Sequence, residues 1–196
     1  MGVFDHQTYL DLIAKVDGAA TPDTKGNTFE DLAQYLLSCL KGVEIAHRDA
    51  VMQSEEIDLV VWNARTDEVL RSWSDVILVE CKNWSSKVDA KNTSWFLSKL
   101  EERSLNTGLL IAASGVTGDY DSGDPTGARD VIRKALGKGI RIITITMDDL
   151  RQINSHDDLL RLLKLRFLGL FVFKVLADWQ PATNPIAQAG NTATTA

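Results

Sequence analysis

The amino-terminal part of the chain has apolar residues at helical spacing. Residues 5–17 show this spacing and predict a helix. Residues 18–26, rich in Gly, Pro and Thr, predict a loop. Residues 27–42 predict a second helix that begins at Asn27 or Thr28. The apolar stripe of this second helix is Phe29, Leu32, Ala33, Leu36, Leu37 and Leu40.

Further along, short apolar or alternating segments predict strands at 43–51, 55–63, 75–84, 107–114 and 140–146. Two helices are expected between the later strands, at 87–104 and 126–139, and a helical turn at 147–153. In the first of these helices, Trp95, Phe96 and Leu100 are expected to face inward. Because helices alternate with strands, we expect βαβ crossovers and partly parallel pairing. The pattern predicts an α/β fold of order α-β-β-β-α-β-α-β, with a central mixed sheet between helices.

Residues 156–176 are rich in Leu and Phe and carry scattered Arg and Lys. A helix to Arg166 is predicted, whereas periodicity does not decide between helix and strand for residues 170–176. The segment fits a packing element of the core, or a self-association or partner surface. Binding to a membrane surface is less favoured, because charges fall all round the helical wheel.

Composition narrows the class of protein. A chain of 196 residues suits one domain with appendages. Cys39 and Cys81, the two cysteines, lie in apolar stretches, which indicates buried free thiols in a reducing compartment. The sequence shows no secretory signal and no run long enough to span a bilayer, so we expect a cytoplasmic protein without a membrane partner. The net charge of −6 gives no overall basic footprint for nucleic acid.

Charged residues at the end of one apolar strand are the first sign of a functional site. Glu80 and Lys82 in "VILVECKNW" are two positions apart and therefore share a strand face. Asp58 interrupts the preceding strand and could lie beside Glu80 in an antiparallel pair. Two close carboxylates repel unless a cation or proton lies between them, and oxygen ligands suit Mg²⁺ or Mn²⁺. Taken alone, Glu80 and Lys82 also fit a salt bridge, and Glu30 fits a first-turn acid that complements the helix dipole.

The stretches "GNTFEDL", "EIDLVV" and "VECKNW" together resemble the PD-(D/E)XK nuclease superfamily, and within it the Mrr-type restriction endonucleases. The resemblance covers about residues 25–150 and implies a restriction-endonuclease-like fold. Two features depart from the family pattern. Glu56 and Ile57 flank Asp58 where glycine is common, and a DNA-recognition domain is not recognisable.

The resemblance implies catalytic roles for Asp58, Glu80, Lys82 and Glu30. It implies Mg²⁺ or Mn²⁺ held by Asp58, Glu80, the Cys81 backbone carbonyl and Glu30. The implied activity is metal-dependent endonucleolytic hydrolysis of phosphodiester bonds, with DNA favoured over RNA, in a bacterial restriction or phage-defence system. The alternative is a non-catalytic subunit that keeps the nuclease fold and serves binding or assembly in a larger complex.

We expect four parts: an N-terminal helix and loop (1–24), the nuclease-like domain (25–153), an apolar and basic helical extension (154–178) and a disordered tail (179–196). The apolar stretch 159–176 predicts a homodimer or a subunit of a larger complex. A local phosphate-facing patch is predicted from Arg151, Arg161, Lys164, Arg166 and Lys174.

Overall fold

A computed structural model describes residues 2–52, 55–118 and 127–172, with the backbone alone at 50–52 and 55. The expected α/β order is confirmed. The elements are α1 (His6–Gly18), α2 (Pro22–Ser38), β1 (Val43–Met52), β2 (Glu55–Asn63), the 3-10 turn η1 (Leu70–Ser72), β3 (Val76–Lys82), α3 (Ala90–Glu102), β4 (Thr107–Ala112), α4 (Ala128–Gly137), β5 (Arg141–Ile145), α5 (Met147–Leu150) and α6 (His156–Gly169).

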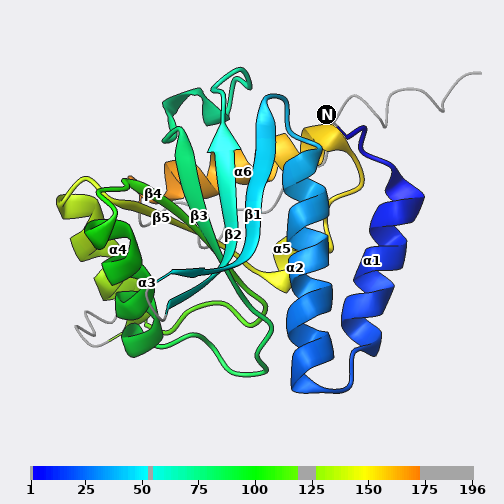
Figure 1. The fold of residues 1–196 in the computed structure, drawn as a ribbon, viewed down its shortest axis with the longest axis horizontal. Helices are drawn as coiled ribbons and strands as arrows, with labels where there is room; N and C mark the ends of the chain where they lie inside the picture. Colours follow the sequence, from blue (N-terminus) through cyan, green and yellow to red (C-terminus); the bar gives the residue numbers. More distant parts are fainter. Residues whose placement is uncertain (1, 53–54, 119–126, 173–196) are drawn as a thin grey trace, which may run out of the picture.

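The sheet is mixed, as predicted. Its five strands lie in the order β1-β2-β3-β4-β5. The pairs β1–β2 and β2–β3 are antiparallel, whereas β3–β4 and β4–β5 are parallel. Figure 1 shows α1 and α2 packed together on one side of the sheet and α3 and α4 on the other. The connections through α3 and α4 are the crossovers that parallel pairing requires.

One hydrophobic core joins all layers. All six residues of β4 are buried, as expected for a central strand covered on both faces. At Gly108 an added Cβ would come within 2.8 Å of the Phe96 ring, so α3 packs directly on the strand backbone. The same core includes Tyr9 from α1 and Leu159 and Leu163 from α6. The first and last helices therefore belong to the packed domain.

The start of α2 was predicted too late. The helix begins at Pro22, inside the expected loop 18–26, and neither Asn27 nor Thr28 caps it. Thr21 is the N-cap and forms a capping box with Thr24, while Pro22 occupies the first turn, where its missing N–H costs nothing. All six residues of the predicted apolar stripe are buried, but the helix ends at Ser38 rather than at residue 42, so Leu40 packs in the core from beyond its end.

Two further predictions differ from the structure. Trp95 was expected to face inward, but it is 55% exposed, because the inward stripe of α3 runs through Thr93, Phe96 and Leu100 instead. The helix expected to end at Arg166 extends to Gly169. The predictions for 173–178, Lys174 included, and for the tail 179–196 lie outside the described residues. Within the described ranges, no helix has the length and apolar character needed to cross a membrane.

Candidate active site

The site is built where β2 and β3 separate. Their antiparallel ladder ends at the pair Leu59–Val79, so Asp58 and Glu80 occupy the next position, which is unpaired between these two strands. There the Asp58 side chain replaces the strand as hydrogen-bond partner: its Oδ2 accepts the Cys81 backbone N–H at 2.6 Å. Both carboxylates are buried. The structure thus brings the two acids side by side, as the sequence predicted.

Two ammonium groups hold the Glu80 carboxylate. Lys82 Nζ lies 2.6 Å from Oε1, and Lys99 Nζ, from α3, lies 2.8 Å from Oε2. Lys82 is partly exposed, whereas Lys99 is buried. Ion pairs of this length are charge-assisted hydrogen bonds, which fix the plane of the carboxylate as well as balance its charge.

Lys82 lies at the mouth of the site. Burial opposes its positive charge, but the neighbouring Glu80 and Asp58 carboxylates outweigh burial and raise the pKa of Lys82. In the metal-free protein, Lys82 is therefore held as an ammonium that donates a hydrogen bond to Glu80. Its Nζ also lies 5.7 Å from the ring centroid of Trp84, which is 40% exposed. The Asn83 amide donates to the Lys25 carbonyl at 3.0 Å and ties this end of β3 to α2.

Glu30 approaches the pair from α2. Burial, followed by the negative charges of Asp58 and Asp49, raises the pKa of Glu30 to about 7, although Arg48 acts in the opposite direction. Arg48 Nε lies 3.3 Å from Glu30 Oε2, and the same guanidinium contacts Asp31. Glu30 is therefore an electrostatic neighbour of Asp58 held by an arginine from β1.

Asp58 carries the clearest sign of crowded negative charge. Burial and then the charge of Glu80 raise its pKa to about 6, against the lowering effects of the Cys81 N–H and of Lys82 and Lys99. A carboxylate in this setting is stabilised by any further cation. Cys81 itself is buried, and burial raises the pKa of its thiol well above the usual range, so the thiol stays protonated and is not a nucleophile.

The donor set fits a partly hydrated Mg²⁺ or Mn²⁺. In the part of the chain that the structure describes, no three His, Cys, Asp or Glu side chains form a group able to hold a metal ion. Mg²⁺ does not need such a cage, because it keeps several waters and binds proteins through one or two carboxylates. Asp58 and Glu80 would supply the carboxylates and the Cys81 carbonyl a further oxygen. Glu30 then fits an indirect role, through water, better than direct ligation.

Two residues of this cluster were missed by sequence reasoning. Lys99 lies three residues after Phe96 and next to Leu100 on the inward side of α3. This helical spacing from Phe96 could have predicted that the lysine is buried. Arg48 lies in a polar stretch of β1 and gives no sequence signal of its own. The predicted residues Glu30, Asp58, Glu80, Cys81 and Lys82 all belong to the cluster.

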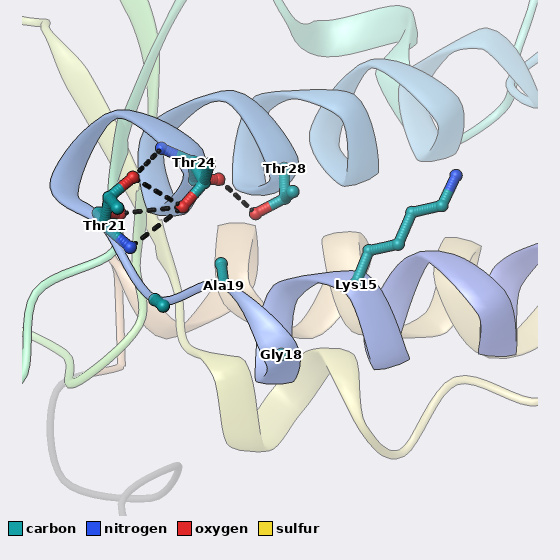
Figure 2. A pocket seen from close by; sticks show the side chains of 7 residues that line it. Lys15, Gly18, Ala19, Thr21, Thr24 and Thr28 are labelled. Atoms are coloured by element: carbon teal, nitrogen blue, oxygen red, sulfur yellow. Dashed lines mark hydrogen bonds between the residues drawn. The ribbon is translucent and has the colours of Figure 1, made fainter.

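A separate hollow lies between the end of α1 and the start of α2 (Figure 2). Lys15 and three threonines are among its lining residues. Thr21 and Thr24 bond to one another in the helix cap, and the Thr28 hydroxyl donates to the Thr24 carbonyl at 2.7 Å. These hydroxyls serve the local structure of α2, and the hollow contains none of the candidate catalytic residues.

Comparison with known proteins places this geometry in a family. The model of the Mrr catalytic domain, described as a restriction endonuclease, matches residues 23–153. A search of curated proteins gives no match. Among solved structures, SfsA from Pyrococcus furiosus in complex with Ca²⁺ is 19% identical, with 62% of this chain and 55% of that chain covered and a TM-score of 0.36. The chain thus spans about half the length of SfsA, and a likeness of this degree says nothing about function.

The family model, in contrast, matches most of the chain and contains the whole cluster from Glu30 to Lys99. The chain therefore belongs to the Mrr-type restriction endonucleases of the PD-(D/E)XK superfamily.

Proposed function

We propose that this protein is a Mg²⁺- or Mn²⁺-dependent endonuclease that hydrolyses phosphodiester bonds of DNA. The observation that carries the proposal is the unpaired register position that holds Asp58 beside Glu80, with the Lys82 ammonium 2.6 Å from Glu80. Family membership supports the reaction class, phosphodiester hydrolysis. The cluster also brings together Glu30, Asp58, Glu80 and Lys82, the charged residues to which the family resemblance assigns catalytic roles.

A divalent ion bound at Asp58 and Glu80 would activate water for attack and polarise the scissile phosphate. The chain's own residues prepare that step. Asp58 and Glu80 place negative charge in a buried gap between the strands, and the Cys81 N–H fixes the Asp58 carboxylate. The Lys82 ammonium would donate a hydrogen bond to the attacking water or to the phosphate oxygens on which negative charge grows. Glu30 can accept a proton or orient water at the edge of the site.

The substrate is DNA in preference to RNA, because restriction endonucleases give the family its description. We place the protein in a bacterial restriction or phage-defence system. Its two buried free thiols suit the cytoplasm. The alternative function, a non-catalytic binding or assembly subunit, is less favoured because Asp58, Glu80 and Lys82 are all present in one cluster.

Assembly belongs to the same proposal. Cutting both strands of a duplex is simplest with two sites related by a twofold axis, which favours a homodimer. Leu168, Phe171 and Val172, at the end of α6, expose apolar surface that self-association could cover. The proposed basic patch is weaker than the sequence suggested, because Arg151 pairs with Asp17 at 2.6 Å and Arg166 pairs with Asp149.

The direct test is incubation of the purified chain with plasmid and, separately, with RNA, in Mg²⁺, Mn²⁺ or EDTA. The proposal predicts nicking or linearisation of plasmid with either metal, little RNA cleavage, and no reaction in EDTA. A Glu80→Gln variant purified in parallel controls for contaminating nuclease. Equal cleavage by the variant, or none by the wild type with either metal, would contradict a catalytic role and favour the non-catalytic alternative.

A further inference from the structure

Lys99 is a charged residue buried on the face of α3 that packs against the sheet, where an apolar side chain would be expected. Its side chain is 3% exposed and extends from the inward face of α3, where the neighbouring positions are occupied by Phe96 and Leu100. Removing an ammonium from water is costly unless well-placed partners replace the lost hydration. A lysine at such a position therefore needs specific partners, and the structure supplies two.

The first partner is Glu80, whose Oε2 accepts from Lys99 Nζ at 2.8 Å. The second is the backbone carbonyl of Glu56, which accepts at 2.5 Å. Glu56 belongs to β2 and lies three residues before Leu59, the residue at which the β2–β3 ladder ends on the site's side. Its carbonyl therefore faces a gap where β3 no longer provides a partner. Lys99 fills this gap and connects β2, β3 and α3 through one ammonium.

This contact also decides which way Glu80 points. With Oε2 held by Lys99, the other oxygen, Oε1, is the one 2.6 Å from Lys82 at the partly exposed mouth of the site. Without Lys99 the carboxylate could rotate about its last bond, and β2 and β3 would keep only the hydrogen bond from the Cys81 N–H to Asp58 as a link beside the site. Asp58, two residues from Glu56 on the same strand face, depends on the same separation of the strands.

We propose that Lys99 is a positioning residue of the nuclease site: it locks Glu80 and the gap between β2 and β3 so that Glu80 Oε1 and Asp58 face one metal ion. The inference rests on the proposed function, because it concerns the same carboxylates. Lys99 contacts neither substrate nor metal in this arrangement and acts through Glu80. Removing the partner that orients a metal ligand typically costs about 10- to 100-fold in metal affinity or activity.

The test compares Lys99→Met, which keeps the length and removes the charge, with Lys99→Arg, which keeps a donor cation. Lys134→Met is the control, since Lys134 also pairs with a carboxylate, 2.7 Å from Asp130, but lies exposed on α4. Each variant is checked for folding by circular dichroism, and Mn²⁺ affinity is measured by calorimetry without substrate. Lys99→Gln, which keeps a shorter donor, replaces Lys99→Met if the latter does not fold.

We expect Lys99→Met to weaken Mn²⁺ binding by about 10- to 100-fold and to raise the Mn²⁺ concentration needed for half-maximal cleavage by a similar factor. Lys99→Arg should restore part of the affinity, and Lys134→Met should match the wild type. In a Glu80→Gln background, Lys99→Met should add little further loss, because the two residues act as a unit.

Wild-type affinity and metal dependence in folded Lys99→Met would overturn the inference and leave the nuclease proposal standing. Tighter Mn²⁺ binding in that variant would also overturn it, because Lys99 would then compete with the metal. A wild type that neither binds Mn²⁺ nor cleaves DNA would instead overturn the proposed function, and the role of Lys99 with it.

Discussion

Replacing Asp58 by Asn should stabilise the metal-free protein while it abolishes cleavage. The pKa of Asp58 is raised from 3.8 to about 6 by burial and by Glu80, so the folded state prefers the neutral acid. Asn resembles that neutral acid in size and can still accept the Cys81 N–H. The rise in the pKa of Asp58 from 3.8 to about 6 corresponds to about 3 kcal/mol of unfolding free energy at neutral pH. Because the crowded charge is shared with Glu30 and Glu80, and because Asn is a weaker acceptor, we expect about 2 kcal/mol of this to be recovered.

The sign of the pH dependence follows from the same pKa. A carboxyl whose pKa is higher in the folded than in the unfolded state binds its proton more tightly when folded, so its stabilising contribution is complete below pH 4. That contribution is lost as the pH rises from about 4 to about 6. Wild type and Asp58→Asn should therefore have similar stability near pH 4 and should differ most at pH 7.5.

Thermal unfolding in EDTA at pH 4.5, 6 and 7.5 measures the effect. For a domain of this size, about 2 kcal/mol corresponds to a rise in Tm of roughly 4–8 °C at pH 7.5. Saturating Mn²⁺ should raise the Tm of the wild type but not that of the variant. Asp130→Asn is a control of opposite sign, because hydrogen bonds from Lys134 and Arg133 lower the pKa of Asp130 and its replacement should give no gain. A lower Tm for Asp58→Asn at pH 7.5 would refute the reasoning, because Asp58 would then stabilise the fold through its cationic neighbours.

Three further outcomes are expected. Lys82→Ala should keep the fold and lower the cleavage rate at least about a hundredfold, as loss of one strong electrostatic stabiliser does. Lys87→Ala, at an exposed position, should leave the rate unchanged. Equal rates for wild type and Lys82→Ala would remove Lys82 from the mechanism. Tyr9→Phe removes the buried hydroxyl that donates to the Leu150 carbonyl and should lower the free energy of unfolding by about 1 kcal/mol in urea, with no change expected in metal affinity. The isolated chain should be a homodimer by light scattering at tens of micromolar, and Phe171→Glu should shift it toward monomer; a wild-type monomer would refute self-association through the end of α6.

The parts of the fold that depend on local pattern could be predicted from the sequence. The strands were found from alternating or continuous apolar runs, and the crossovers from their alternation with helices. The start of α2 was missed because Gly, Pro and Thr were taken as signs of a loop, although Thr21 and Pro22 are also a helix cap and a first-turn residue. Composition alone does not distinguish these uses, since the distinction depends on the capping geometry.

The site could be predicted as far as its residues lie on two consecutive strands. Asp58 and Glu80 follow from strand periodicity and an antiparallel pair, which needs only a register. Lys99 reaches the site from α3, whereas Arg48 lies opposite Leu59 in the β1–β2 ladder and reaches across to Glu30 of α2. Both contacts therefore depend on how the helices pack on the sheet. The separation of β2 and β3 after Leu59–Val79 likewise has no signal in either strand by itself.

The most direct measurement of the central claim is the position of a bound metal ion. Crystals grown with Mn²⁺ at pH 7.5 would show it by anomalous scattering. The account predicts one peak at the separation of β2 and β3, coordinated by a carboxylate oxygen of Asp58 and one of Glu80, with the Cys81 carbonyl in reach. A peak elsewhere in the molecule, or none at Mn²⁺ concentrations that support cleavage, would contradict it.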